Sequence, residues 1–238
     1  MVDFIHWPAN LLVPARATAA PSPFTRSGGR TLGGIQRNTR TDKGFWRIGL
    51  NEVSVRTPAM RRTWNSIRTD LGGKAGLIAV PVWSFDSAPF ASGSREREVL
   101  TTHDDGTPFD DGSHYHQGSI DIEMASYAPL GSTVVTLRLI HAASAAGIRF
   151  SYQHALYETG RIISEPGAGL CQVALSTAIR QPIPAGAKLE VDMPTCLCHL
   201  AEDQGMDLLL SNTEIETASV DFVEAVDFWN DLALGRVE

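Results

Sequence analysis

Residues 45–83 decide the fold of this chain and read FWRIGLNEVSVRTPAMRRTWNSIRTDLGGKAGLIAVPVW. Residues 45–55 alternate apolar and polar side chains with the period of two that is typical of a β-strand. Trp46, Ile48 and Leu50 occupy even positions and so share one face, whereas Val53 and Val55 occupy odd positions. This change of parity predicts a β-bulge near Asn51.

A helix and a second strand are predicted next. Thr57 suits the N-cap, Pro58 suits the first helical position, and Gly72-Gly73 predicts the end of the helix. Between them, apolar residues recur at helical spacing and arginines fall on the outer face; the apolar set is Met60, Trp64, Ile67 and Leu71, and the arginines are Arg61, Arg62 and Arg68. The run Ala75–Trp83 predicts a buried strand that tolerates Pro81 only at a sheet edge or near the strand's end.

The flanking chain predicts an extended arm and a series of strands. Residues 1–44 are rich in proline and glycine, which favours loop or edge strand, and we expect one short hairpin at Gly33–Arg40. The later strand candidates are Ser119–Met124, Thr133–Ile140, Gly147–Gln153, Leu170–Leu175, Lys188–Met193, Thr195–Leu200, Met206–Ser211 and Ala218–Val226. One principal α-helix among so many strands predicts an all-β fold.

Charge is divided between the two ends of the chain. Residues 1–68 hold eleven basic and three acidic residues, a balance of +8, and residues 202–238 hold one basic and ten acidic residues, a balance of −9. A subunit with opposite charges on two flanks suits head-to-tail contact with copies of itself, which closes into a ring or extends as a filament. We therefore expect a homo-oligomer in which the basic leading segment of one copy contacts the acidic trailing segment of the next.

Composition argues against several classes of partner. A net charge of −7 and a pI near 5.5 do not favour nucleic-acid binding, which needs a basic face. No apolar run approaches the roughly 18 residues that span a bilayer, and no basic and apolar leader is visible at the start. Three cysteines form an odd set without a second pair at metal-ligand spacing, so we expect reduced thiols and synthesis in the cytoplasm.

The candidate chemistry is confined to one loop. Residues 103–116 contain His103, His114 and His116 together with several aspartates, a density that could bind Zn²⁺ or Ca²⁺. Two Asp-Gly turns, at Asp105-Gly106 and Asp111-Gly112, favour the simpler interpretation of a solvated hairpin. No Gly-x-Ser-x-Gly motif is present. We therefore predict no catalytic residues, no metal ligands and no cofactor, and we expect that the protein is not an enzyme.

Cysteines and tryptophans point mainly to the core. Cys196 and Cys198 lie two apart in a strand-like run, so their sulfurs share a face, and we expect buried, unreactive thiols. Trp46, Trp64 and Trp83 occupy regular apolar patterns and are predicted to be buried. The two tryptophans of the terminal segments, Trp7 and Trp229, would be interface anchors if they are exposed.

Four stretches resemble the distal tail proteins of long-tailed bacteriophages and related phage-like tail particles, which form a ring linking the tail tube to the baseplate or tip fibre. They are residues 45–81 with Ser87-Ala88-Pro89; residues 105–113; the run from Gly147-Ile148-Arg149-Phe150-Ser151 through Pro184-Ala185-Gly186 to residues 193–201; and Val220-Asp221-Phe222-Val223-Glu224-Ala225. The likeness lies in the order and character of these stretches and includes no catalytic motif.

The resemblance implies a fold and a set of partners. Residues 1–90, completed by 203–238, would form a ring-building β-sandwich, and residues 91–202 an inserted β-barrel or galectin-like module. Six copies would close a ring in the tail tip of the virion, contacting the tail-tube protein on one side and baseplate hub or tip proteins on the other. The arm at residues 1–44 is longer than a simple ring domain needs, and we expect it to reach a neighbour.

Two other functions remain open from the sequence. A carbohydrate-binding module or adhesin is suggested by the strand-rich insert and the aromatic residues. An enzyme such as a glycan hydrolase or metal-dependent hydrolase is suggested only by the loop at residues 103–116.

Overall fold

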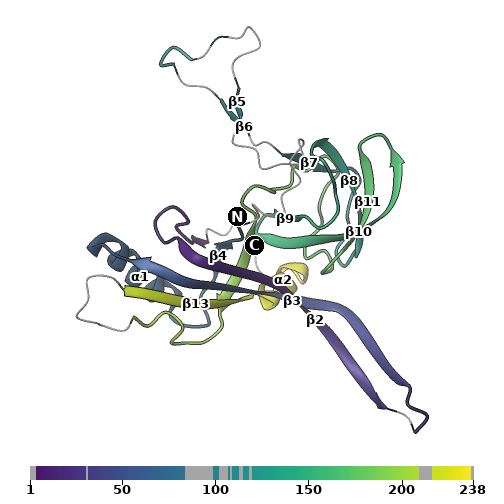
Figure 1. Ribbon diagram of the computed structural model, residues 1–238, viewed down its shortest axis with the longest axis horizontal. Helices are drawn as coiled ribbons and strands as arrows, with labels where there is room; N and C mark the ends of the chain where they lie inside the picture. Colours follow the sequence, from purple (N-terminus) through teal and green to yellow (C-terminus); the bar gives the residue numbers. More distant parts are fainter. Residues whose placement is uncertain are drawn as a thin grey trace.

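The computed structural model describes residues 4–30, 32–83, 99–101, 107, 109–112, 115–117, 120–208 and 216–236. Its strands are β1 (Ile5–His6), β2 (Pro14–Arg30), β3 (Gln36–Val55), β4 (Ile78–Pro81), β5 (Val99–Thr101), β6 (Tyr115–Gln117), β7 (Asp121–Met124), β8 (Val134–His141), β9 (Arg149–Tyr152), β10 (Ala155–Gly167), β11 (Leu170–Leu175), β12 (Thr195–Leu200) and β13 (Glu216–Glu224). The helices are α1 (Pro58–Leu71) and α2 (Val226–Ala233). The chain is mostly β with one principal helix, which confirms the predicted class (Figure 1).

The first sheet has six strands in the order β1-β4-β12-β13-β3-β2. Only the short β1 runs parallel to its neighbour β4, and the other adjacent pairs are antiparallel. Helix α1 packs on this sheet through Trp64, Ile67 and Leu71, which share a core with Trp46. The predicted helix ends are confirmed: the Thr57 hydroxyl accepts a hydrogen bond from the Met60 N–H at 3.2 Å, and Gly72 takes a left-handed conformation at φ 58°.

The predicted bulge lies in β3. Leu50 pairs with Val220 and Val53 with Ala218, so two residues of β3, Asn51 and Glu52, stand opposite a single residue of β13. Glu52 has φ 56°, and its N–H donates to the Ser219 hydroxyl at 3.3 Å. The extra residue returns the side chains beyond the bulge to the face that Leu50 occupies, which explains the change of parity in the sequence.

The second sheet has five antiparallel strands in the order β7-β8-β11-β10-β9 and curves into a half-barrel. A segment without regular strand structure spans its open side. Glu123 of β7 bridges to Lys188, and Ser151 of β9 bridges to Glu190, so residues 188–190 connect the two edges of the sheet. The run Lys188–Met193, expected to be a full strand, therefore makes isolated bridges to two different strands.

The two cores share strand β12, which lies inside the segment 91–202 that the resemblance assigns to an inserted module. Cys196 and Cys198 on one face of β12 lie in the core of the first sheet, whereas Leu197 on the other face lies in the core of the second. Because β12 pairs with β4 and β13, the first sheet includes residues that were assigned to the insert 91–202. Helix α2 also packs on the second core, through Trp229, although it belongs to the segment 203–238 that was expected to complete the first body.

The arm at residues 1–44 is mainly one strand of a long hairpin. Strands β2 and β3 pair from Pro14↔Val53 to Arg30↔Gln36, so the hairpin extends well beyond the expected Gly33–Arg40. β2 is an edge strand of the first sheet, in agreement with its proline content. Figure 1 shows the far end of this hairpin projecting from the body as a two-stranded ribbon.

Candidate functional site

A buried ion pair joins the two cores. Glu224, at the end of β13, has a fully buried side chain, and its Oε1 accepts a hydrogen bond from Arg180 Nε at 2.8 Å. Its Oε2 accepts from Arg180 Nη2 at 3.1 Å and from the Trp46 N–H at 3.0 Å. A bidentate pair of this kind fixes both the separation and the orientation of the two groups. The loop of the half-barrel that carries Arg180 is thereby attached to β3 and β13 of the first sheet.

Further hydrogen bonds surround this pair. Arg180 Nη2 also donates to the carbonyl of Gly44, and the Arg180 N–H donates to the Tyr157 hydroxyl at 2.9 Å. Trp46 Nε1 donates to the carbonyl of Leu156 at 2.8 Å. Burial raises the pKa of Tyr157, so the phenol stays protonated and neutral beside the ion pair. Together these contacts connect β3, β10, β13 and the Arg180 loop through groups that are shielded from water.

The tight turn between β9 and β10 is a second point of attachment. Gln153 and His154 both have positive φ, at 47° and 68°, the geometry of a two-residue hairpin turn that usually favours asparagine or glycine. The His154 carbonyl accepts from the Leu197 N–H at 2.8 Å, and Gln181 Nε2 donates to the Tyr152 carbonyl at 3.0 Å. Contacts from the rest of the molecule therefore hold a backbone conformation that these residues seldom adopt.

Histidines and aromatic rings pack around the same turn. The His154 ring lies 5.1 Å from the His6 ring and 5.8 Å from the Phe4 ring, and His154 Nδ1 is 2.9 Å from the Thr195 hydroxyl. Burial, together with the nearby His6, lowers the pKa of His154. His154 is therefore neutral at physiological pH and links the β9–β10 turn to β1 and β12.

A third histidine connects β12 to α2. His199 Nδ1 is 2.9 Å from the Gly76 carbonyl, and Nε2 is 2.9 Å from Asp227 Oδ1. Burial acts to raise the pKa of Asp227, but the hydrogen bond and charge attraction from His199, together with backbone hydrogen bonds from Phe228 and Asp227, outweigh it, so the pKa lies below its ordinary value. A histidine oriented by a carboxylate is also seen in catalytic triads. Here both ring nitrogens are engaged in bonds that hold α2 to β12 and to the loop before β4.

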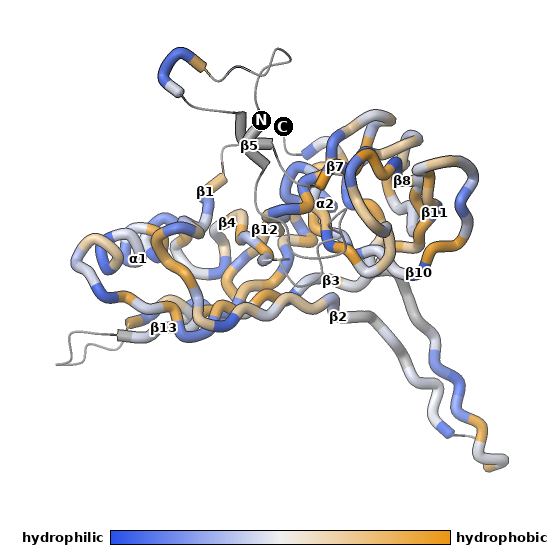
Figure 2. Tube along the Cα trace, turned by 45° about the horizontal axis from the view of Figure 1, so that its top comes forward, coloured by the Kyte–Doolittle hydropathy of each residue, from blue (hydrophilic) through white to orange (hydrophobic). Residues whose placement is uncertain are grey.

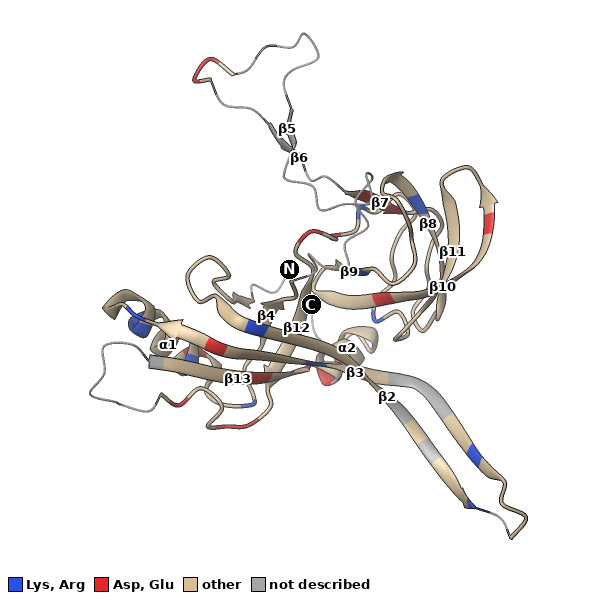
Figure 3. Ribbon diagram, viewed as in Figure 1, with Lys and Arg blue, Asp and Glu red and all other residues tan. Residues whose placement is uncertain are grey.

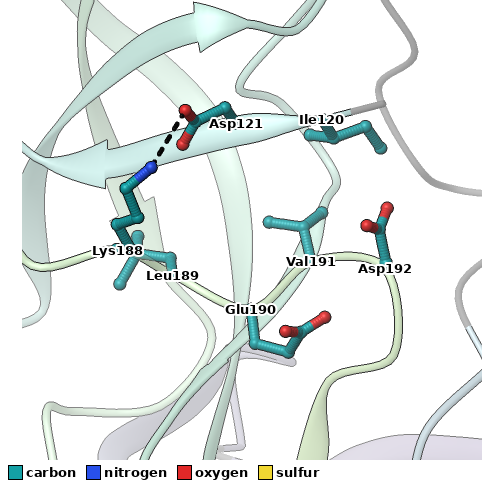
Figure 4. A pocket seen from close by; sticks show the side chains of 7 residues that line it. All are labelled: Ile120, Asp121, Lys188, Leu189, Glu190, Val191 and Asp192. Atoms are coloured by element: carbon teal, nitrogen blue, oxygen red, sulfur yellow. Dashed lines mark hydrogen bonds and ion pairs between the residues drawn. The ribbon is translucent and has the colours of Figure 1, made fainter. Parts of the chain in front are cut away.

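The half-barrel has an open depression of about 310 Å³ at its bridged side (Figure 4). Lys188 Nζ lies 3.3 Å from Asp121 Oδ2, and Glu190 Oε1 accepts from the Met193 N–H at 2.9 Å. The lining residues are Ile120, Asp121, Lys188, Leu189, Glu190, Val191 and Asp192. None of these seven side chains is aromatic, so the described lining of the depression offers no ring on which a sugar could stack.

Half of the loop at residues 103–116 lies outside the described residues. Of it, the structure describes the turn ending at Gly112, which has φ 79° and whose N–H donates to the Phe109 carbonyl at 2.8 Å. The turn differs from the one expected, because Asp110 and Asp111 take its two central positions, Gly112 is its fourth residue, and Asp111 has no positive φ. His103, His114 and the side chain of His116 lie outside the described part of the chain. In the described part of the chain, no three histidine, cysteine, aspartate or glutamate side chains gather in a way that could hold a metal ion.

The cysteines and tryptophans lie in the cores. Cys196 and Cys198 are fully buried, and burial, with Cys198 beside it, raises the pKa of Cys196, as expected for unreactive thiols. Trp46 and Trp64 are fully buried, and Trp83 is half-buried at the edge of the first core. Trp7 and Trp229 are each 4% exposed, so neither satisfies the condition under which it was expected to anchor an interface.

Some of the charge contrast between the chain ends is satisfied within one subunit. Arg68 Nη1 lies 3.1 Å from Asp207 Oδ1, and the Lys74 N–H donates to Asp203 Oδ1 at 3.0 Å. The acidic strand β13 also pairs directly with β3 along residues 47–55. These charges already have partners within their own subunit, so they are not needed for contact between copies. The basic residues farther along the β2–β3 hairpin are the better candidates for such a contact (Figure 3).

Sequence reasoning missed Arg180 and Glu224. A signal for Glu224 was present, because Val220, Phe222 and Glu224 alternate on one face and that face is buried. A carboxylate at a core position of an alternating strand requires a buried partner. Nothing in the sequence near Arg180 identifies it as that partner, since it lies 44 residues away in an irregular loop.

Comparison with known proteins gives no relative: no protein-family model matches the sequence, and no curated protein matches it. Within the described residues, neither helix is long and apolar enough to cross a membrane.

Proposed function

We propose that the chain is a structural subunit of a phage-like tail that forms a ring at the distal end, between the tail tube and the baseplate hub or tip fibre. The observation that carries the proposal is the buried junction of Arg180 and Glu224, which makes one rigid block of two β-rich bodies. A structural subunit must keep its contact surfaces in fixed relative positions, and a water-shielded bidentate pair between its two halves provides that rigidity.

The polar groups around the junction support the same proposal. His199 bonds to Gly76 and Asp227, His154 lies against Thr195, and Glu224 accepts three hydrogen bonds. These are groups that enzymes use for acid–base chemistry, but here their bonds connect one structural element to another. The four sequence stretches that resemble distal tail proteins give the proposal its particular form.

Two measurements test the proposed function. Sedimentation velocity of the purified full chain at low ionic strength should show one discrete oligomer, expected to be a hexamer, and a monomer at every concentration and salt level would contradict it. Antibodies raised against the chain and coupled to gold should label phage-like particles from the producing cells at the distal end of the tail. Label on heads, or on no part of the particles, would contradict the assignment to the tail tip.

A further inference from the structure

The far end of the β2–β3 hairpin is a ribbon that the described parts of its own chain do not support. We call residues 24–41, from the Phe24↔Thr41 pair to the tip, the distal hairpin. Strand β13 pairs with β3 only from Arg47 onward, so the two strands of the distal hairpin pair only with each other within the described residues. An isolated two-stranded hairpin is marginally stable in water, and it gains stability when a third strand or a packing surface covers it.

The tip of this ribbon exposes apolar side chains between arginines. Leu32 is fully exposed and Ile35 is 63% exposed, and Arg30 and Arg37 are exposed on either side of them. Figure 2 shows the hydrophobic colour at the tip of an otherwise polar ribbon. Apolar side chains accompanied by arginine are enriched at the centres of protein interfaces. The tip therefore has the composition of a contact surface.

Prolines are distributed unevenly along the edge strand. Pro14, Pro21 and Pro23 lie in the proximal part of β2, where missing N–H groups hinder pairing with another strand, whereas residues 24–41 contain no proline. The proximal edge is thus protected against unwanted association, while the distal hairpin lacks this protection. This difference is expected if the distal hairpin has a partner of its own.

Charge identifies the partner. The distal hairpin contains four arginines and no acidic residue, a charge of +4. Since the whole chain has a net charge of −7, the residues outside the distal hairpin have a net charge of −11. A second copy of the chain therefore presents a strongly acidic body to a basic ribbon. We propose that the distal hairpin of one copy docks on the body of a second copy, with Leu32 and Ile35 as apolar anchors and Arg30 and Arg37 paired with acidic side chains.

This inference rests on the proposed function and specifies how its subunits meet. When the hairpin of one copy contacts the body of the next, the two surfaces in contact are different, and the interface is heterologous. Such an interface repeats head to tail, and it closes into a ring when the rotation between successive subunits divides a full turn. Salt should weaken the contact, because complementary surface charges are screened.

Charge reversal on the ribbon tests the docking. The double variant Arg30→Glu with Arg37→Glu should weaken self-association about tenfold or more at low salt, and Leu32→Ser with Ile35→Ser should weaken it similarly. The matched control is Arg56→Glu with Arg62→Glu, which makes the same change in net charge at exposed positions of the body and should leave association near the wild-type level. All these residues lie outside the two cores, and thermal unfolding followed by circular dichroism verifies that each variant folds.

A photo-crosslinker placed at Leu32 identifies the docked surface. In an equal mixture of ordinary and ¹⁵N-labelled protein, crosslinks between copies join one light and one heavy peptide in about half of the products, as random pairing of two equal pools requires. Such mixed crosslinks to body peptides are expected. Crosslinks confined to one copy, or tip variants that assemble as well as wild type, would overturn the docking while leaving the ring proposal intact. A wild-type chain that never assembles would instead contradict the ring itself.

Discussion

Arg180 and Glu224 form a two-point ion pair across the junction of the two cores, with Nε–Oε1 at 2.8 Å and Nη2–Oε2 at 3.1 Å. The arginine side chain is 10% exposed and the glutamate side chain is fully buried. Removing one member of such a pair leaves a buried charge without compensation, which costs more than the pair itself contributes. The junction is therefore the place where a single substitution should affect stability most.

We expect Arg180→Met and Glu224→Gln each to lower the free energy of unfolding by about 3 kcal/mol. The double variant should lose less than the sum of the two, because it removes both members of one interaction. Urea unfolding at pH 7 measures all three. The control is Glu158→Gln, which breaks the pair with Arg149 whose side chains are only partly buried, at 25% and 28% exposed, and should cost about 1 kcal/mol. Strictly additive losses at the junction would contradict the account.

The N-cap of α1 should contribute a separable amount of stability. Thr57→Ala removes the hydroxyl that accepts from the Met60 N–H, and we expect a loss of about 1 kcal/mol. Thr69→Ala in the same helix removes an exposed hydroxyl that bonds to the Asn65 carbonyl, and helix propensity favours alanine there. In thermal unfolding, the midpoint temperature should therefore fall for Thr57→Ala and not for Thr69→Ala. If both midpoints fall equally, the Thr57 hydroxyl does not stabilise the helix as an N-cap.

Stability should fall as the pH drops from about 7 towards 5. The pKa of His154 is lowered in the folded state by burial and by His6, so the unfolded chain takes up the proton more readily. The stabilisation that neutral His154 gives the folded state is fully present above its ordinary pKa of about 6.5. It is lost as the pH falls through the lower pKa of the folded state. The pKa of Asp227 is also lowered in the folded state, so protonation of Asp227 reduces the free energy of unfolding only below about pH 4, outside this range.

The variant His154→Asn tests this pH dependence. Asparagine tolerates the positive φ at this position and does not titrate, so the unfolding free energy of the variant should change less between pH 7.5 and pH 5.5 than that of wild type. Urea unfolding at the two pH values gives the comparison. A variant that keeps the full wild-type slope would show that His154 is not the responsible group.

The three cysteines should react slowly with thiol reagents in the folded protein. All are buried, and burial raises the pKa of Cys171 and of Cys196, so little thiolate is present at pH 7. A colorimetric thiol assay should detect almost no reaction in buffer and three thiols in denaturant. One thiol that reacts rapidly in the native protein would contradict the burial described here.

The sequence predicts elements whose signals are local. Helix α1 has a cap, a proline at its start and glycines at its end, and all were interpreted correctly. Helix α2 lacks these signals, since Ala225 makes no side-chain cap, and its first residue was assigned to the preceding strand. Strand β10 was missed because register shifts and Gly160 interrupt its alternation, and pairing with β9 and β11 determines its conformation instead.

The junction is beyond local signals for a similar reason. Arg180 and Glu224 are 44 residues apart, and Trp46 is 178 residues from Glu224. The division of the chain at residues 91 and 202 came from the resemblance to distal tail proteins, whereas in the structure two cores share β12 and Trp229 packs in the second. Tertiary packing brings these residues together, and no local pattern in a single sequence indicates which distant residues will be in contact.

Cryo-electron microscopy of the purified chain at low ionic strength tests the central claim most directly. The account predicts closed rings, six-fold in the form that we propose, in which the ribbon of residues 24–41 from each subunit lies on the acidic body of the next. Isolated subunits at every concentration, or an assembly in which those ribbons point into solvent, would contradict it.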